Sequence, residues 1–284
     1  MVTQHFHRKL ILLLGVAFCL TLVSSWARAH EGLHEQIVAI TVKIKRDPKN
    51  ASLYLQRGEL YRLHRDWTRA AADYDRASRI QPSLTIVDIG RGKMLLESRR
   101  YQQAKFVLDR FLRQQPRHVE GLITRGRVLA RIGARLEAAK DFTEALALAA
   151  APEPELYLER AQVLAQDERY IQEALRGLNE GIKQLGPLVT LELAAIDLEL
   201  REHNYDAALT RLDVITAQSE RKETWLVRRG EILKAAGRHK EARKAFNAGI
   251  VAIESLTPER RQSRAITALQ LRARSALKSY RTRP

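Results

Sequence analysis

One short pattern in the sequence could support metal-dependent hydrolysis. His30-Glu31-Gly32-Leu33-His34 fits H-E-x-x-H, in which one helix supplies two zinc ligands and a general base. That chemistry requires a stable helix and a third ligand elsewhere. Here a glycine in the middle of the motif lowers the helix propensity, and no third-ligand signature follows. We therefore interpret the match as accidental and predict neither an enzyme nor a metal site.

The residues before this pattern are typical of a secretory signal peptide. Arg8 and Lys9 precede the apolar stretch Leu10–Val23, which is shorter than the roughly 20 residues of a membrane span. Ala27-Arg28-Ala29 fits an A-x-A cleavage site. We therefore predict a signal peptide over residues 1–29 and a periplasmic or secreted protein, with no transmembrane span in the mature chain.

Cleavage after Ala29 would leave a second metal hypothesis open. The imidazole and free α-amine of His30, with His34 nearby, would offer nitrogen ligands for copper. This alternative function, copper handling, requires that His30 is the first residue of the mature protein.

The sequence also lacks the residues needed for thiol chemistry and for a phosphate-binding loop. Cys19 is the only cysteine, it lies in the apolar stretch, and Phe18 precedes it where a lipoprotein site needs a small residue. The mature chain would therefore have no thiol for disulfides, nucleophilic catalysis or metal binding. The sequence from Gly121 to Arg127 approaches a P-loop but has Arg127 in place of the phosphate-binding lysine. We predict no cofactor.

The net charge of +16 and the pI of about 10.2 favour anionic partners or an arginine-rich solvated surface. Nucleic acid is not an expected partner, because the chain is predicted to leave the cytoplasm.

The sequence contains an internal repeat that would position these candidate residues. Glycines, alanines and prolines recur at intervals of 34 residues: Gly58, Gly92 and Gly126; Ala70, Ala104 and Ala138; Pro48, Pro82 and Pro116. Prolines at helix boundaries and small residues at helix crossings explain the pattern physically. The spacing and residue types resemble the tetratricopeptide repeat (TPR) family.

The resemblance covers six repeats over residues 48–257. The fourth repeat has one inserted residue between its helices, and the fifth departs most from the pattern. The small residues assigned to the repeat positions are Gly58, Gly92, Gly126, Ala161 and Gly230 on the first helices, and Ala70, Ala104, Ala138, Ala174, Ala208 and Ala242 on the second.

This resemblance implies an all-α fold, a right-handed solenoid of helix-turn-helix pairs. Solenoid ends need covering, so we expect a capping helix, or half repeat, over residues 30–47. A basic capping helix and tail is expected over residues 258–284, beginning at Thr257-Pro258. A basic amphipathic helix in this place could alternatively contact an anionic membrane surface.

The resemblance also implies a non-catalytic scaffold that binds a protein or peptide in a groove lined by the first helix of each pair. On this chain the candidate groove residues are Arg62, Lys93, Arg127 and Arg131. Because they are basic, we expect an acidic partner segment. The alternative is an ordinary solvated face of mixed charge.

An arginine directly precedes the small residue in five of the repeats: Arg57, Arg91, Arg125, Arg160 and Arg229. These arginines could form a ladder for anions. Since Asp73 and Asp141 follow Arg57 and Arg125 at the same spacing of 16 residues, we favour Arg–Asp pairs between the two helices of a repeat, with other partners in the remaining repeats.

Overall fold

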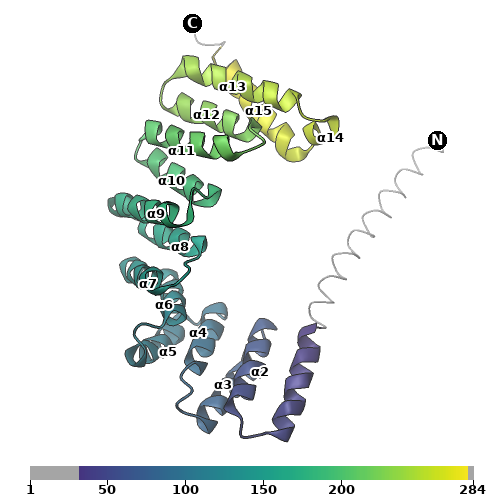
Figure 1. Ribbon diagram of the computed structural model, residues 1–284, viewed down its shortest axis with the longest axis vertical. Coiled ribbons are helices and arrows are strands. Elements are labelled where there is room, and N and C mark those ends of the chain that lie inside the picture. Colours follow the sequence, from purple (N-terminus) through teal and green to yellow (C-terminus); the bar gives the residue numbers. More distant parts are fainter. Residues whose placement is uncertain (1–31, 281–284) are drawn as a thin grey trace, which may run out of the picture. The chain divides into compact units, whose positions relative to one another are not determined.

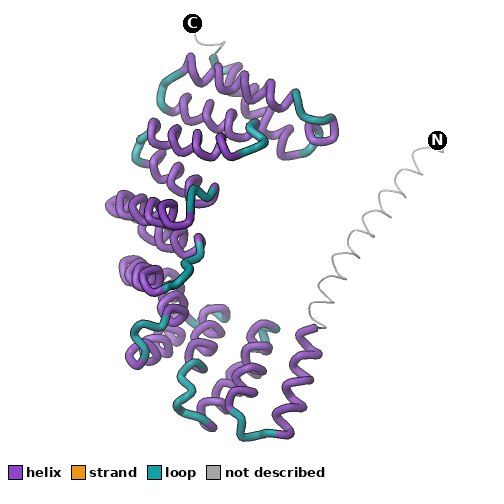
Figure 2. The backbone as a smooth tube through the Cα atoms, viewed as in Figure 1, coloured by secondary structure: helices purple, strands orange, loops and turns teal. Residues whose placement is uncertain are grey.

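The computed structural model describes residues 32–280, and every regular element in that range is a helix (Figures 1 and 2). This confirms the all-α class. The predicted signal peptide over residues 1–29 and His30 lie outside the described residues. The chain divides into two compact units, Met1–Ala134 and Arg135–Pro284, which are described separately.

The described part of unit 1 starts with a helix over residues 32–46, followed by helices that pack against their neighbours in the sequence. Its helices are α2 (Ala51–Leu63), α3 (Trp67–Ile80), α4 (Val87–Glu97), α5 (Tyr101–Gln114) and α6 (Val119–Arg131). Each hydrophobic face is buried against the next helix, and Tyr74, Leu108 and Val128 are completely enclosed in one core.

Unit 2 continues the same succession of helices. They are α7 (Arg135–Leu148), α8 (Pro154–Leu164), α9 (Ile171–Leu185), α10 (Val189–Arg201), α11 (Tyr205–Gln218), α12 (Glu223–Ala235), α13 (His239–Glu254), α14 (Pro258–Arg261) and α15 (Arg264–Lys278). Ile196, Val227 and Phe246 lie in a core that extends as far as α15. At the residue inserted in the fourth repeat, the short 3-10 helix η1 (Glu168–Tyr170) connects α8 to α9.

The small residues assigned to the repeat positions lie against large side chains of the second helix. A Cβ atom on Gly58 would come within 2.8 Å of the Tyr74 ring, and one on Gly230 within 2.7 Å of the Phe246 ring. Gly92 stands in the same relation to Leu108. The alanines at 70, 104, 138, 174, 208 and 242 are all fully buried. Close packing therefore leaves no room for larger residues at these positions.

Left-handed residues end the first helix of most pairs. Arg65, Arg99, Gly133, His203 and Gly237 all have positive φ angles, between 56° and 82°. The amide one residue further on bonds the carbonyl five residues back, as in Asp66 N to Tyr61 O at 2.8 Å and Arg238 N to Leu233 O at 2.9 Å. This is a Schellman-type helix end, and it reverses the chain into the second helix.

The two end segments pack against their neighbours. Ile37 and Ile44 of the N-terminal helix are buried. At the C-terminal end, two helices are found where a single helix was expected. Thr257 precedes the short α14, and the Ser263 side chain accepts a hydrogen bond from Ile266 N at the start of α15. The division into residues 30–47, 48–257 and 258–284 stays a prediction.

The apolar stripe of α15 is used for packing. Ile266, Leu269 and Ala273 are buried, and Leu277 and Tyr280 pack against the same core of unit 2. In this fold the stripe is therefore not available to a membrane surface, although Leu271 remains exposed.

Candidate partner-binding surface

The first helices of the pairs in unit 1 lie side by side: α2 contacts α4, and α4 contacts α6. Two ion pairs connect them. Arg62 of α2 pairs with Glu97 of α4, and Lys93 of α4 pairs with Glu120 of α6. Because each pair spans two helices, Arg62 and Lys93 belong to one continuous surface. We call the surface that carries Arg62, Lys93, Arg127 and Arg131 the first-helix face.

Arg62 is held in a hydrogen-bonded network rather than presented freely to solvent. Its Nε donates to Glu59 Oε2 at 3.0 Å, and the hydroxyl of Tyr74 on α3 donates to Glu59 Oε1 at 2.7 Å. Burial would lower the pKa of Arg62, but the carboxylates of Glu59 and Glu97 raise it. Burial and the bond to Glu59 raise the pKa of the Tyr74 hydroxyl.

Gly90 of α4 provides the space for this network. A Cβ atom at this position would lie 2.4 Å from Glu59 Oε1 and 3.0 Å from the Tyr74 ring. Gly90 and Gly92 are both inside helix α4, and their lack of a side chain lets neighbouring helices approach closely.

Arg127 and Arg131 are the more accessible cations of the first-helix face. Both side chains are exposed on α6 and four residues apart, so they lie on the same side of that helix. Glu120, which pairs with Lys93, lies two turns earlier on α6. The surface is therefore less basic than the sequence suggests, because Glu59, Glu97 and Glu120 accompany Arg62 and Lys93.

The arginine that precedes each small residue pairs with a carboxylate. Arg57 binds Asp73 through two hydrogen bonds of 2.7 Å, Nε to Oδ2 and Nη2 to Oδ1, and this bond raises the pKa of Arg57. The predicted Arg57–Asp73 pair between the helices of one repeat is confirmed. The predicted Arg125–Asp141 pair stays a prediction.

Several of the other arginines pair backwards along the chain. Arg91 Nη2 lies 2.7 Å from Asp75 Oδ1, Arg125 Nη1 lies 3.2 Å from Asp109 Oδ1, and Arg229 pairs with Asp213. Each of these carboxylates is on the second helix of the preceding pair. Arg160 Nη2 instead binds Glu180 Oε2 at 2.7 Å. The arginine series is therefore structural, since its members join helices within and between repeats.

The remaining sequence candidates are dispersed. His34 is exposed on the N-terminal helix, while His64, His118, His203 and His239 are at helix ends or turns. Within residues 32–280, no three or more His, Cys, Asp or Glu side chains are grouped as metal ligands would be. No helix among the described residues is long and apolar enough to cross a membrane. The P-loop-like glycines 121 and 126 are inside α6.

Stacked helix pairs with small residues at every crossing define the class of repeat solenoids. Two models of TPR families match the sequence: a tetratricopeptide repeat-like domain over residues 149–273 and a tetratricopeptide repeat over residues 89–153. The chain is a tetratricopeptide repeat protein, as the residue pattern indicated. A comparison with curated proteins finds no match.

Solved structures agree with this fold. A TPR protein from Parabacteroides merdae is 19% identical, with a TM-score of 0.52 over 88% of this chain and 96% of the other. The C-terminal part of a TPR protein from Cytophaga hutchinsonii is 11% identical, with a TM-score of 0.63 over 81% of this chain and 93% of the other. At these identities the similarity concerns the fold alone.

Sequence reasoning missed the acidic partners of Arg62 and Lys93. Arg62 and Glu97 are 35 positions apart, close to the repeat length of 34, so a search for opposite charges at that offset would have found this pair. Lys93 and Glu120 are 27 positions apart, which is about two helical turns less than one repeat, and no such search would have found them.

Proposed function

We propose that this chain is a non-catalytic scaffold of the cell envelope, and that its first-helix face binds an acidic segment of a partner protein. The observation that supports this is the pair of contacts Arg62–Glu97 and Lys93–Glu120, which join the first helices α2, α4 and α6 into one surface that carries cations. TPR proteins are generally binding scaffolds, and helical solenoids offer extended surfaces to helices or extended segments.

The existing ion pairs determine how an acidic segment would bind. A partner carboxylate that approaches Lys93 must compete with Glu120, whereas one that approaches Arg131 of α6 meets an exposed guanidinium group. We therefore expect recognition to be centred on α6 and weakened by salt, because pairs at the surface are screened.

The partner can be captured by chemical crosslinking in the native compartment, and its affinity for the purified chain then measured. The double variant Lys93→Glu plus Arg127→Glu should weaken binding about tenfold or more at low salt, with a smaller difference at high salt. Arg243→Glu plus Lys244→Glu, on the exposed side of α13, makes the same change in charge elsewhere and should not weaken it. Equal affinity for the two double variants contradicts the proposed surface.

The proposed location has its own test. Export with cleavage after Ala29 gives a mature protein that begins at His30, which N-terminal sequencing of the protein from the envelope fraction would detect. Recovery of the uncleaved chain from the cytoplasm contradicts the location and leaves the binding proposal untouched.

A further inference from the structure

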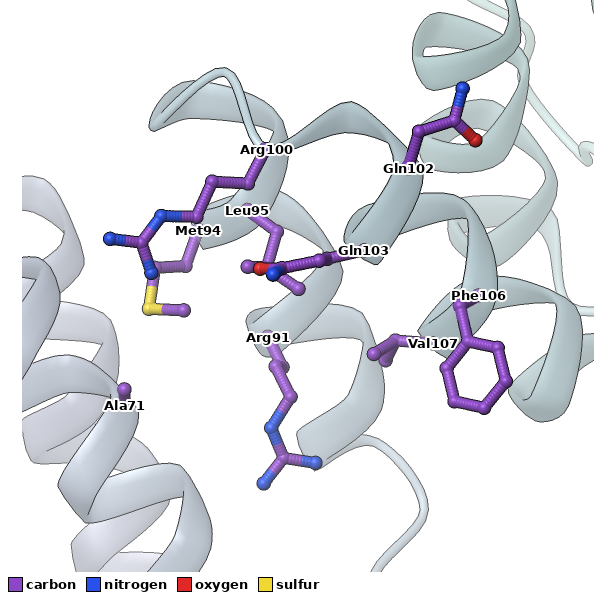
Figure 3. A pocket seen from close by; sticks show the side chains of 9 residues that line it. All are labelled: Ala71, Arg91, Met94, Leu95, Arg100, Gln102, Gln103, Phe106 and Val107. Carbon is purple, nitrogen blue, oxygen red and sulfur yellow. The ribbon is translucent and has the colours of Figure 1, made fainter.

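A second surface of unit 1 has the features of a peptide-binding site, and it is distinct from the first-helix face. A recess with a volume of about 470 Å³ lies between α3 and α5, with α4 as its floor (Figure 3). Ala71 of α3 borders one side and Phe106 of α5 the other, while Met94 and Leu95 of α4 lie between them. We call this the α3–α5 recess.

The recess contains an unusually exposed aromatic side chain. Phe106 is 67% exposed, whereas Phe111, on the same helix, is 1% exposed in the core. Val107, Met94 and Leu95 continue the apolar surface inward from Phe106. An apolar recess of this kind, bordered by the polar side chains of Gln102 and Gln103, is typical of a surface that a partner covers.

The charges at the recess specify the chemistry of that partner. Two arginines line it. Arg91 is neutralised by Asp75 and Asp88, at 2.7 and 2.9 Å. Arg100 is exposed, and its side chain has no carboxylate partner among residues 32–280. Its guanidinium therefore keeps all of its donors available for an incoming carboxylate.

We propose that the α3–α5 recess binds an acidic peptide segment of a partner protein. The segment inserts one large apolar side chain between Ala71 and Phe106 and places a neighbouring carboxylate on Arg100. A peptide fits better than a lipid surface, because Met94, Leu95 and Val107 are buried at the base of a hollow and do not protrude. The proposal does not depend on the first-helix face.

Selection from a random peptide library displayed on phage tests this with the purified chain as target. The double variant Arg100→Glu plus Phe106→Ser serves for counter-selection. Enriched peptides should contain a large apolar residue close to Asp or Glu. Binding of a labelled enriched peptide should fall about tenfold or more with either single substitution. It should not change with Lys93→Glu plus Arg127→Glu.

Two controls separate this result from misfolding and from general stickiness. Both substituted side chains are exposed, so thermal unfolding of the single variants should match the wild type. Val251→Ser removes an apolar side chain that is 65% exposed on α13 and should leave peptide binding intact. The proposal is overturned if no peptide is enriched, if enriched peptides bind Arg100→Glu as well as the wild type, or if the recess substitutions instead abolish binding to vesicles of anionic phospholipid.

Discussion

At the scale of single residues, Arg211 of α11 binds two buried carboxylates of unit 2. Its Nη1 lies 3.2 Å from Glu192 Oε2, and its Nη2 lies 3.3 Å from Glu199 Oε1 and 2.8 Å from the amide oxygen of Asn179. Glu192 and Glu199 are only 4% and 7% exposed. The positive charge of one guanidinium group therefore stabilises the negative charges of two glutamates that have little contact with water.

Replacing Arg211 with alanine should lower the free energy of unfolding by about 3–5 kcal/mol, because two buried carboxylates would lose their cationic partner. Arg228→Ala is the matched control: it breaks the pair with Asp197, which is 68% exposed, and should cost less than about 1 kcal/mol. Chemical denaturation measures both. Equal costs would mean that the buried cluster is not formed.

The raised pKa of Tyr74 leads to a prediction of how stability depends on pH. Its pKa is raised by burial and by the hydrogen bond to Glu59, so the folded protein retains the phenolic proton more strongly than the unfolded chain. The stabilisation is fully present below the pKa of an ordinary tyrosine, about 10, and is lost as the pH rises above it. The unfolding free energy of Tyr74→Phe, measured between pH 8 and 11, should fall less steeply than that of the wild type. Parallel curves would contradict this.

At the scale of elements, the turns between the helices of a pair share one backbone conformation, although the residues at the turn differ. Positions 65, 99, 133, 203 and 237 all adopt the left-handed conformation. Glycine adopts it without strain, whereas a residue with a Cβ atom is disfavoured there. The turn therefore depends on the Schellman-type hydrogen bonds more than on residue type.

A substitution at Gly237 would measure the free-energy cost of placing a residue with a Cβ atom in the left-handed conformation. A Cβ atom added to it would meet nothing within 4 Å, so Gly237→Ala introduces strain without a steric clash. We expect it to lower the unfolding free energy by about 1 kcal/mol, and Arg65→Gly to raise stability or leave it unchanged. Thermal and chemical denaturation would detect both changes. A stabilising Gly237→Ala would exclude a left-handed residue at this turn.

The helices were predictable from the sequence because small and large residues recur where the two helices of each repeat pack against each other. Gly58 and Tyr74 mark one crossing, and the 34-residue interval repeats it. The left-handed arginines were not predictable in the same way, because Arg65 and Arg99 do not belong to the usual turn residues. The break between α14 and α15 was also missed, since Ser263 is only one of several possible helix-capping residues in that stretch.

At the scale of the whole molecule, the two compact units contain one kind of repeat and a large excess of positive charge. The positions of the candidate groove residues followed from the repeat pattern. Their electrostatic surroundings did not, because Glu97 and Glu120 reach Arg62 and Lys93 only when neighbouring repeats are stacked. Net charge alone therefore overstates how basic the first-helix face is.

Glu120→Gln tests the central claim most directly, because it removes the internal competitor of Lys93 without adding a contact. The measurement is the dissociation constant of the captured partner for the wild type, Glu120→Gln and Lys93→Glu. If an acidic segment binds the first-helix face, Glu120→Gln should bind several-fold more tightly than the wild type and Lys93→Glu more weakly, at unchanged thermal stability. Affinities that are equal, or that follow the reverse order, would contradict the account.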